Sequence, residues 1–312
     1  MPFEQFIIFF LLLITGFFCK KYNVFSDSAV SGINTFIIYI GYPCLILVRT
    51  TALDMDHRIF INFLFAFFIN LGLLLLFGTY GRFYCRGKRF HDDDKPVAEL
   101  ALMSSNNGFI GFPVAVSFFG DLGLFYMVAC NIALNTTFFT YGVSVMRRGR
   151  ASNESFKKKA AGFFLMLASP KVSVAIAGII LCYNHITLPE IANDFCSIVG
   201  SIATPMAMIS IGTMLAGNFG PRSFKKHAVM EPVLNRLFIV PLASAAIVWF
   251  LPLDPLVKTI IIVSNALPVA TMVAILSEQY NQNKGLAGET IVISTLFSMV
   301  TVPLVIWLLT NL

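Results

Sequence analysis

Ten apolar runs divide the chain, and most of them are long enough to cross a membrane as a helix. A helix that crosses a bilayer needs about 20 mostly apolar residues. The composition agrees, because 57% of the residues are hydrophobic and 12% are charged, whereas soluble domains are roughly 25% charged. The sequence therefore predicts an all-α polytopic membrane protein. The ten predicted spans cover residues 4–19, 29–49, 59–81, 96–119, 122–146, 171–184, 190–217, 228–251, 255–279 and 286–310.

The positive charges are distributed unevenly between the connections. Of the 22 Lys and Arg residues, 18 lie in connections after odd-numbered spans, three lie after even-numbered spans, and Arg236 lies inside the eighth span. By the positive-inside rule, the positively charged connections are cytoplasmic. We therefore expect an integral plasma (inner) membrane protein with both termini on the extracytoplasmic side. The net charge of +6 then reflects topology and contact with anionic lipid, not a nucleic-acid partner.

The last five spans repeat the interruptions of the first five in the same order. Pro43 in the second span matches Pro205 in the seventh, and Pro113 in the fourth matches Pro268 in the ninth. Because five is an odd number, the second copy is inverted relative to the first. Inverted repeats with matching broken helices indicate a secondary transporter whose site lies near the bilayer midplane. The predicted organisation is a first repeat at 1–147, a cytoplasmic connection with an interfacial amphipathic segment at 148–170, and a second repeat at 171–312.

The interruptions themselves are polar. The fourth span contains "SSNNGFIGFP" and the ninth contains "SNALP". Irregular backbone at membrane depth is tolerated only where protein buries it or a wet cavity solvates it. Half-helices that begin near Pro113 and near Pro268 would expose free N–H groups and a partial charge of about +0.5 each, which favours an anion such as a carboxylate. For either proline alone, a packing kink is the simpler alternative. The predicted binding residues are Asn106, Asn107, Gly108, Pro113, Asn265 and Pro268.

A second group of polar residues has two possible roles, ligand binding and helix packing. Asn131 and Asn135 are four residues apart on the fifth span, so they share a helix face. Ligand contact and interhelical hydrogen bonding are both open for this pair. Ser201 and Thr204 precede the proline of the seventh span, where small-residue packing is the alternative to a binding role.

Arg236 is the charge best placed to lie within the membrane, and such a residue is a functional candidate by default. The structural alternative, which we favour from the sequence, is that it snorkels to the surface or pairs with Glu231. No Asp or Glu lies at mid-span, and no Ser/His/Asp, HExxH or Walker pattern occurs. The His and Cys residues are scattered, without metal-ligand spacing. We therefore expect no enzyme activity, no cofactor and no metal.

Several segments resemble the auxin efflux carrier family, which includes the plant PIN carriers and their bacterial relatives. The similar segments are "SNNGFIGFPVA", "SPKVSVAIAGIILCYNHITLPE", "PMAMISIGTMLA" and "NALPVATMVAILSEQYN". The resemblance implies ten helices in two inverted five-helix repeats, similar to NhaA and the bile-acid symporters. It also implies a scaffold bundle and a transport bundle, with the fourth and ninth helices crossing at their breaks. The substrate carboxylate is then expected at that crossing.

The same resemblance assigns individual residues. Asn106 matches the family's fourth-span Asn, Asn135 matches a polar ligand position on the fifth span, and Tyr42 falls at a position that lines the PIN site. The chain departs from the plant carriers at Ser105, where they have Pro, and it has only a short central connection. These departures favour malate, malonate or other organic acids over auxin-like acids.

The sequence therefore predicts a membrane transporter of small organic anions with elevator-type alternating access. A monoanion that leaves a cytoplasm at −100 mV gains about 2.3 kcal/mol, so export needs no coupled ion. Two alternatives stay open: a symporter that couples organic-acid uptake to Na⁺ or H⁺, and a membrane sensor that uses a degenerate carrier fold. Homodimer formation is also left open.

Overall fold

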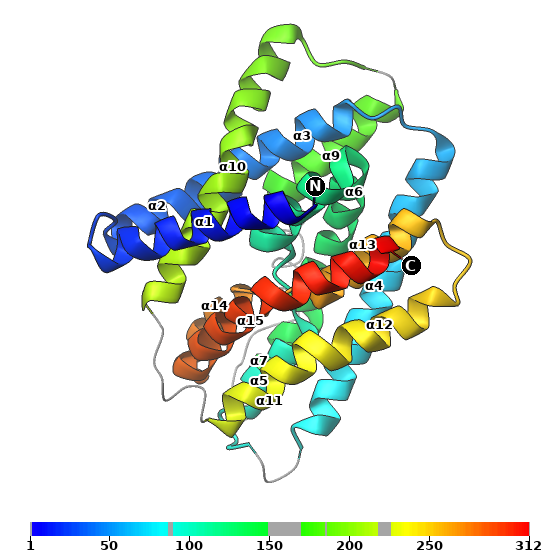
Figure 1. The fold of residues 1–312 in the computed structure, drawn as a ribbon. Helices are drawn as coiled ribbons and strands as arrows, with labels where there is room; N and C mark the ends of the chain where they lie inside the picture. Colours follow the sequence, from blue (N-terminus) through cyan, green and yellow to red (C-terminus); the bar gives the residue numbers. More distant parts are fainter. Residues whose placement is uncertain (1, 87–89, 149–169, 185, 218–225, 312) are drawn as a thin grey trace. The chain divides into compact units, whose positions relative to one another are not determined.

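The computed structural model describes residues 2–86, 90–148, 170–184, 186–217 and 226–311, and in these ranges the chain is helical without strands (Figure 1). This agrees with the predicted class of polytopic helical membrane protein. Helix also lies within each of the ten predicted ranges, but the inverted ten-span topology stays a prediction. The amphipathic segment expected at 148–170 lies almost wholly outside the described residues. In the described part of the chain, six helical stretches, some with internal breaks, are long and apolar enough to cross a membrane: Asp27–Thr51, His57–Tyr84, Lys95–Met146, Glu190–Ala216, His227–Trp249 and Lys284–Asn311.

The chain packs as two compact units, each assembled from separate parts of the sequence. Unit 1 contains Met1–Phe65, Gly108–Ala129 and Leu167–Gly217, and unit 2 contains Ala66–Asn107, Cys130–Met166 and Asn218–Leu312. Each unit therefore draws on both halves of the chain. The repeat boundaries predicted from the sequence describe a different division, and they stay a prediction.

In unit 1, helices α1 (Pro2–Lys21) and α10 (Glu190–Gly217) pack with their backbones in direct contact. An added Cβ at Gly16 would lie 2.0 Å from the carbonyl oxygen of Ile209, and one at Gly212 would lie 2.1 Å from that of Leu13. Such close approach between membrane helices requires small residues. The elements of unit 1 include α1 (Pro2–Lys21), α2 (Asp27–Phe36), a π-helical turn (Ile37–Gly41), α3 (Tyr42–Thr51), α9 (Pro170–Tyr183) and α10 (Glu190–Gly217).

Unit 2 contains the helix breaks that the sequence predicts. Its elements are most of α4 (His57–Tyr84), α5 (Lys95–Met103), the last part of α6 (Phe112–Thr137), α7 (Val143–Met146), α11 (His227–Leu234), α12 (Val240–Trp249), α13 (Pro255–Ala266), α14 (Met272–Gln279) and α15 (Lys284–Asn311). Helix α6 bends at Gly120, where φ is 65°, in the part of the helix that belongs to unit 1. This bend falls between the predicted fourth and fifth spans.

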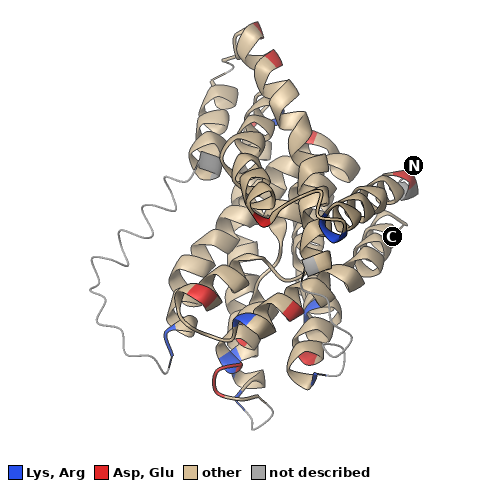
Figure 2. Ribbon diagram, turned by 90° about the vertical axis from the view of Figure 1, so that its left-hand side faces the viewer, with Lys and Arg blue, Asp and Glu red and all other residues tan. Residues whose placement is uncertain are grey.

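Charged residues gather near helix ends and connections, and most of the helical ribbon carries none (Figure 2). Among the described residues, three charged side chains are buried, namely Asp94, Glu99 and Arg236. All three belong to unit 2. Because a buried charge is costly unless it is paired, each of these three side chains requires an opposite charge or hydrogen-bonding groups beside it.

Candidate functional site at the two helix breaks

Two helices of unit 2 are interrupted close to the predicted positions. Helix α5 ends at Met103, after which Ser104 is extended with φ −93° and ψ 137°. Helix α13 ends at Ala266, after which Leu267 is extended with φ −67° and ψ 153°. The prediction that the second half-helix begins near Pro268 is wrong, because α14 begins at Met272. Proline disfavours the helical region for the residue before it, so the chain stays extended there.

The two breaks are hydrogen-bonded to each other. The backbone N–H of Asn106 donates to the carbonyl of Pro268 at 2.8 Å. The hydroxyl of Ser264 on α13 donates to Oδ1 of Asn107 at 3.1 Å. Backbone groups that leave a helix inside a membrane need new partners, and these bonds supply some of them. The predicted residues Asn106, Asn107, Asn265 and Pro268 are all buried here.

Arg236 binds the ends of both interrupted helices. It lies in the π-helical turn Asn235–Ile239 between α11 and α12 and is 0% exposed. Its Nε donates to the carbonyl of Leu267 at 3.1 Å. Its Nη1 donates to the carbonyls of Leu102 at 3.2 Å and Met103 at 3.4 Å. The expectation that Arg236 snorkels or pairs with Glu231 is therefore wrong, because the carbonyls at helix C-terminal ends provide a buried alternative partner for a cation.

These contacts leave a positive balance of charge at the breaks. The C-terminal ends of α5 and α13 each carry a partial charge of about −0.5, and together they offset the positive charge of the Arg236 guanidinium. The N-terminal end of α14 adds a partial charge of about +0.5. The Nη2 atom of Arg236 has no hydrogen-bond partner in the described part of the chain. The arrangement thus combines a surplus of positive charge with a free donor.

Four further buried polar atoms near the breaks lack a partner among the described residues. An unsatisfied buried polar group costs about 1–3 kcal/mol, so such a group of atoms points to a ligand or to bound water. The amide nitrogen and the two hydroxyls can donate to a carboxylate, and the amide oxygen can accept from a hydroxyl. The atoms are Ser104 Oγ, Ser105 Oγ, Asn107 Nδ2 and Asn265 Oδ1.

Asn70, which was not predicted from the sequence, hydrogen-bonds to Asn265 at the second break. Its Oδ1 accepts from Nδ2 of Asn265 at 2.8 Å, and its own Nδ2 donates to the carbonyl of Cys130 at 3.1 Å. Asn70 is 0% exposed in the middle of α4. A single Asn within the apolar run "FLFAFFINLGLLLLF" was the available signal.

The remaining predicted residues lie elsewhere. In unit 2, Nδ2 of Asn135 donates to Oδ1 of Asn131 at 3.0 Å, which confirms that this pair shares a helix face. In unit 1, Tyr42 is buried, and its hydroxyl lies 3.5 Å from the carbonyl of Phe109. Its ring packs edge-on against Phe112 with centroids 5.1 Å apart.

Gly108, Pro113, Ser201 and Thr204 also belong to unit 1. Pro113 is buried in the first turn of α6. Ser201 is exposed, donates to the carbonyl of Ile198 at 2.7 Å, and lines a cavity of about 170 Å³. Within the first break, the structure thus assigns Gly108 and Pro113 to unit 1 and residues 104–107 to unit 2.

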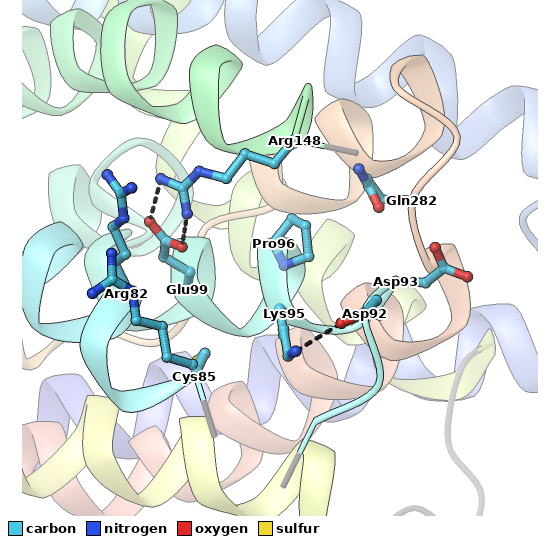
Figure 3. A pocket seen from close by; sticks show the side chains of 10 residues that line it. Arg82, Cys85, Asp92, Asp93, Lys95, Pro96, Glu99, Arg148 and Gln282 are labelled. Atoms are coloured by element: carbon cyan, nitrogen blue, oxygen red, sulfur yellow. Dashed lines mark hydrogen bonds and ion pairs between the residues drawn. The ribbon is translucent and has the colours of Figure 1, made fainter. Parts of the chain in front are cut away.

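A larger cavity of unit 2, about 530 Å³, opens beside α5 (Figure 3). Glu99 of α5 is 2% exposed and binds both Nη1 and Nη2 of Arg148, the second at 3.0 Å. The hydroxyl of Tyr141 also donates to Glu99. Burial raises the pKa of the Cys85 thiol to about 12, and the negative charge of Glu99 adds to this effect. The lining residues are Arg82, Cys85, Arg86, Asp92, Asp93, Lys95, Pro96, Glu99, Arg148 and Gln282.

The family described as membrane transport protein matches residues 2–306 of this chain. The chain belongs to this family. The match confirms the resemblance to the auxin efflux carriers and indicates a multi-pass membrane transporter with a small-molecule substrate. As a transporter family, it does not point to an enzyme.

Three relatives of this membrane transport protein illustrate its range. An uncharacterized transporter of Methanocaldococcus jannaschii is 25% identical over 99% of both chains. A Rhizobium meliloti protein, provisionally named a malonate transporter, is 23% identical over 96% of this chain and 93% of its own. A Mus musculus protein named lysosomal cholesterol signaling protein is 22% identical over 96% of this chain and 36% of its own.

Proposed function

We propose that this membrane transport protein is a secondary carrier for small organic anions, and that a substrate carboxylate binds between the two helix breaks. One observation carries the proposal. Arg236 is completely buried, its hydrogen bonds go to backbone carbonyls, and its Nη2 stays open. Arginine is well suited to carboxylates because its planar fork matches their geometry.

The carboxylate would complete the hydrogen bonding of the breaks. One oxygen accepts from Nη2 of Arg236, and the other accepts from the hydroxyl of Ser104 or Ser105 and from Nδ2 of Asn107. Charge-assisted hydrogen bonds are about twice as strong as neutral ones, and burial strengthens them further. Asn265 Oδ1 would accept from a hydroxyl or a protonated acid group of the substrate. Malonate and malate meet these requirements, and one relative carries a malonate transporter name.

Transport would follow an elevator-type mechanism in which unit 2 carries the site across the membrane. Residues 104–107 of the first break, the whole second break and Arg236 belong to unit 2, which supports this assignment. The protein would lie in the plasma (inner) membrane with both termini outside. At −100 mV, each negative charge that leaves the cytoplasm gains about 2.3 kcal/mol, so export can be driven by the potential. Coupling of uptake to Na⁺ or H⁺ is the alternative, and it predicts flux that depends on that ion's gradient.

The test is flux of labelled malonate and malate in proteoliposomes under a potassium diffusion potential. We expect potential-driven flux for the wild type and loss of flux for Arg236→Gln, with the melting temperature showing that the variant is folded. Arg58→Gln is the matched control, because Arg58 is exposed at the start of α4, and its flux should equal the wild type. Equal flux in Arg236→Gln and the wild type contradicts the proposed site.

A sensor function is the second candidate, favoured by the relative named as a signaling protein. A sensor would bind its ligand without moving it. A ligand-induced rise in melting temperature with no measurable flux under any gradient therefore supports the sensor. Flux of the same ligand supports the carrier. Screening carboxylates and a sterol in parallel separates the two chemistries.

A further inference from the structure

The guanidinium of Arg236 lies within a cage of backbone carbonyls. Three carbonyl oxygens, of Leu102, Met103 and Leu267, surround its Nε and Nη1 at 3.1–3.4 Å. They come from the C-terminal ends of two different interrupted helices, α5 and α13. In carriers with broken helices, carbonyls of this kind are typical ligands of a bound cation. In this protein the guanidinium of Arg236 occupies the position of such a cation.

Other uncharged oxygens are close in sequence to the cage. Ser104 and Ser105 follow its first two carbonyls directly, and Asn265 precedes the third by two residues. Their Oγ and Oδ1 atoms are buried without a partner in the described chain. Without the side chain of Arg236, the two helix ends would leave a total of about −1 elementary charge buried without a counter-charge. In carriers with broken helices, oxygens of this kind together with negative charge favour the binding of a monovalent cation.

We propose that Arg236 is a built-in cation, and that this carbonyl cage binds a free monovalent cation once the side chain is removed. Free guanidinium should bind best because it has the shape and the donors of the missing group. The two helix ends already offset this built-in charge, so the positive charge left for a substrate carboxylate is the partial charge of about +0.5 at the N-terminal end of α14. This inference concerns charge balance in the proposed carrier and rests on that function, whereas the cage itself can be tested without transport.

The experiment compares purified Arg236→Ala with Arg236→Met in detergent by thermal unfolding. Guanidinium chloride, NaCl and choline chloride are each titrated through the low millimolar range. Both variants should melt below the wild type. The melting temperature of Arg236→Ala should rise by several degrees with guanidinium, less with Na⁺, and not with choline, which is too large. Arg236→Met should not respond, because its side chain fills the space, and the wild type should not respond because the cage is occupied.

Other outcomes overturn the proposal. A folded Arg236→Ala that ignores all three salts contradicts the cage, and so does an equal response in Arg236→Met or the wild type. If Arg236→Ala cannot be purified, Arg236→Lys decides, since its ammonium should occupy the cage and make it more stable than Arg236→Met. A Lys variant no more stable than the Met variant contradicts the proposal. A positive cage result without anion flux in the wild type would reject only the carrier function.

Discussion

The backbone N–H of Asn106 donates to the carbonyl of Pro268 at 2.8 Å, and this bond joins the two interrupted helices. Neither group has a helical partner, because α5 ends at Met103 and α14 begins only at Met272. Each break therefore satisfies a group that the other leaves open. Because an unpaired backbone group is costly at membrane depth, this bond stabilises both breaks.

The hydroxyl of Ser105 should matter for binding but not for stability. It is buried without a partner in the described structure, so Ser105→Ala removes no hydrogen bond from the unliganded protein. We expect an unchanged or slightly higher melting temperature. Affinity for the carboxylate, measured by calorimetry, should fall roughly tenfold or more, as expected for a lost bond to a charged group.

Ser264→Ala is the matched control for this prediction. Its hydroxyl donates to Asn107 at 3.1 Å, so its removal should destabilise the protein by about 1 kcal/mol even without ligand. The opposite pattern, with Ser105→Ala destabilising and leaving affinity unchanged, would show that the serine hydroxyl is structural.

The contact between α1 and α10 should not tolerate a methyl group. A Cβ at Gly212 would lie 2.1 Å from the carbonyl oxygen of Leu13, so Gly212→Ala forces the backbones apart. We expect destabilisation of about 1–3 kcal/mol or more, measured by unfolding in detergent. Gly32→Ala on α2 is the control, because a Cβ there meets nothing within 4 Å, and it should stabilise by up to about 1 kcal/mol. Equal effects of the two changes would refute the close packing.

The ion pair beside the large cavity should stabilise unit 2. Arg148→Gln leaves the carboxylate of Glu99 buried without its cation. The expected loss is below the about 3–5 kcal/mol of a fully buried pair, because the side chain of Arg148 is 36% exposed and solvent screens it. The double variant Glu99→Gln with Arg148→Gln should recover part of that loss in the same unfolding assay. If the double variant recovers no stability, the unpaired charge of Glu99 is not the cause of the loss in Arg148→Gln.

The orientation predicted from charge can be tested with two histidines that are both exposed. His57 follows the second predicted span and His91 follows the third. In a cysteine-free background, His57→Cys should react with a membrane-impermeant maleimide on intact cells. His91→Cys should react only after permeabilisation. The reverse labelling pattern would place both termini in the cytoplasm and invert the assignment of the charged connections.

Much of the helical architecture and part of the site follow from local features of the sequence. Long apolar runs give membrane-length helices because the bilayer sets their length. The positions of the breaks follow from clusters of Ser, Asn, Gly and Pro, whose effect on the backbone is also local. Asn106, Asn107 and Asn265 could therefore be named from the sequence, and the structure buries all three next to the breaks.

Tertiary structure alone decided which distant residues complete these breaks. Arg236 hydrogen-bonds to the carbonyls of Leu102 and Leu267, and Asn70 hydrogen-bonds to Asn265. Beside the large cavity, Glu99 likewise pairs with the distant Arg148. From the sequence, Arg236 was expected at the surface or beside Glu231, because a charge alone in an apolar run gives no sign of its partner. That partner is a pair of helix ends, and the negative charge of a helix end exists only once the helix has formed and stopped.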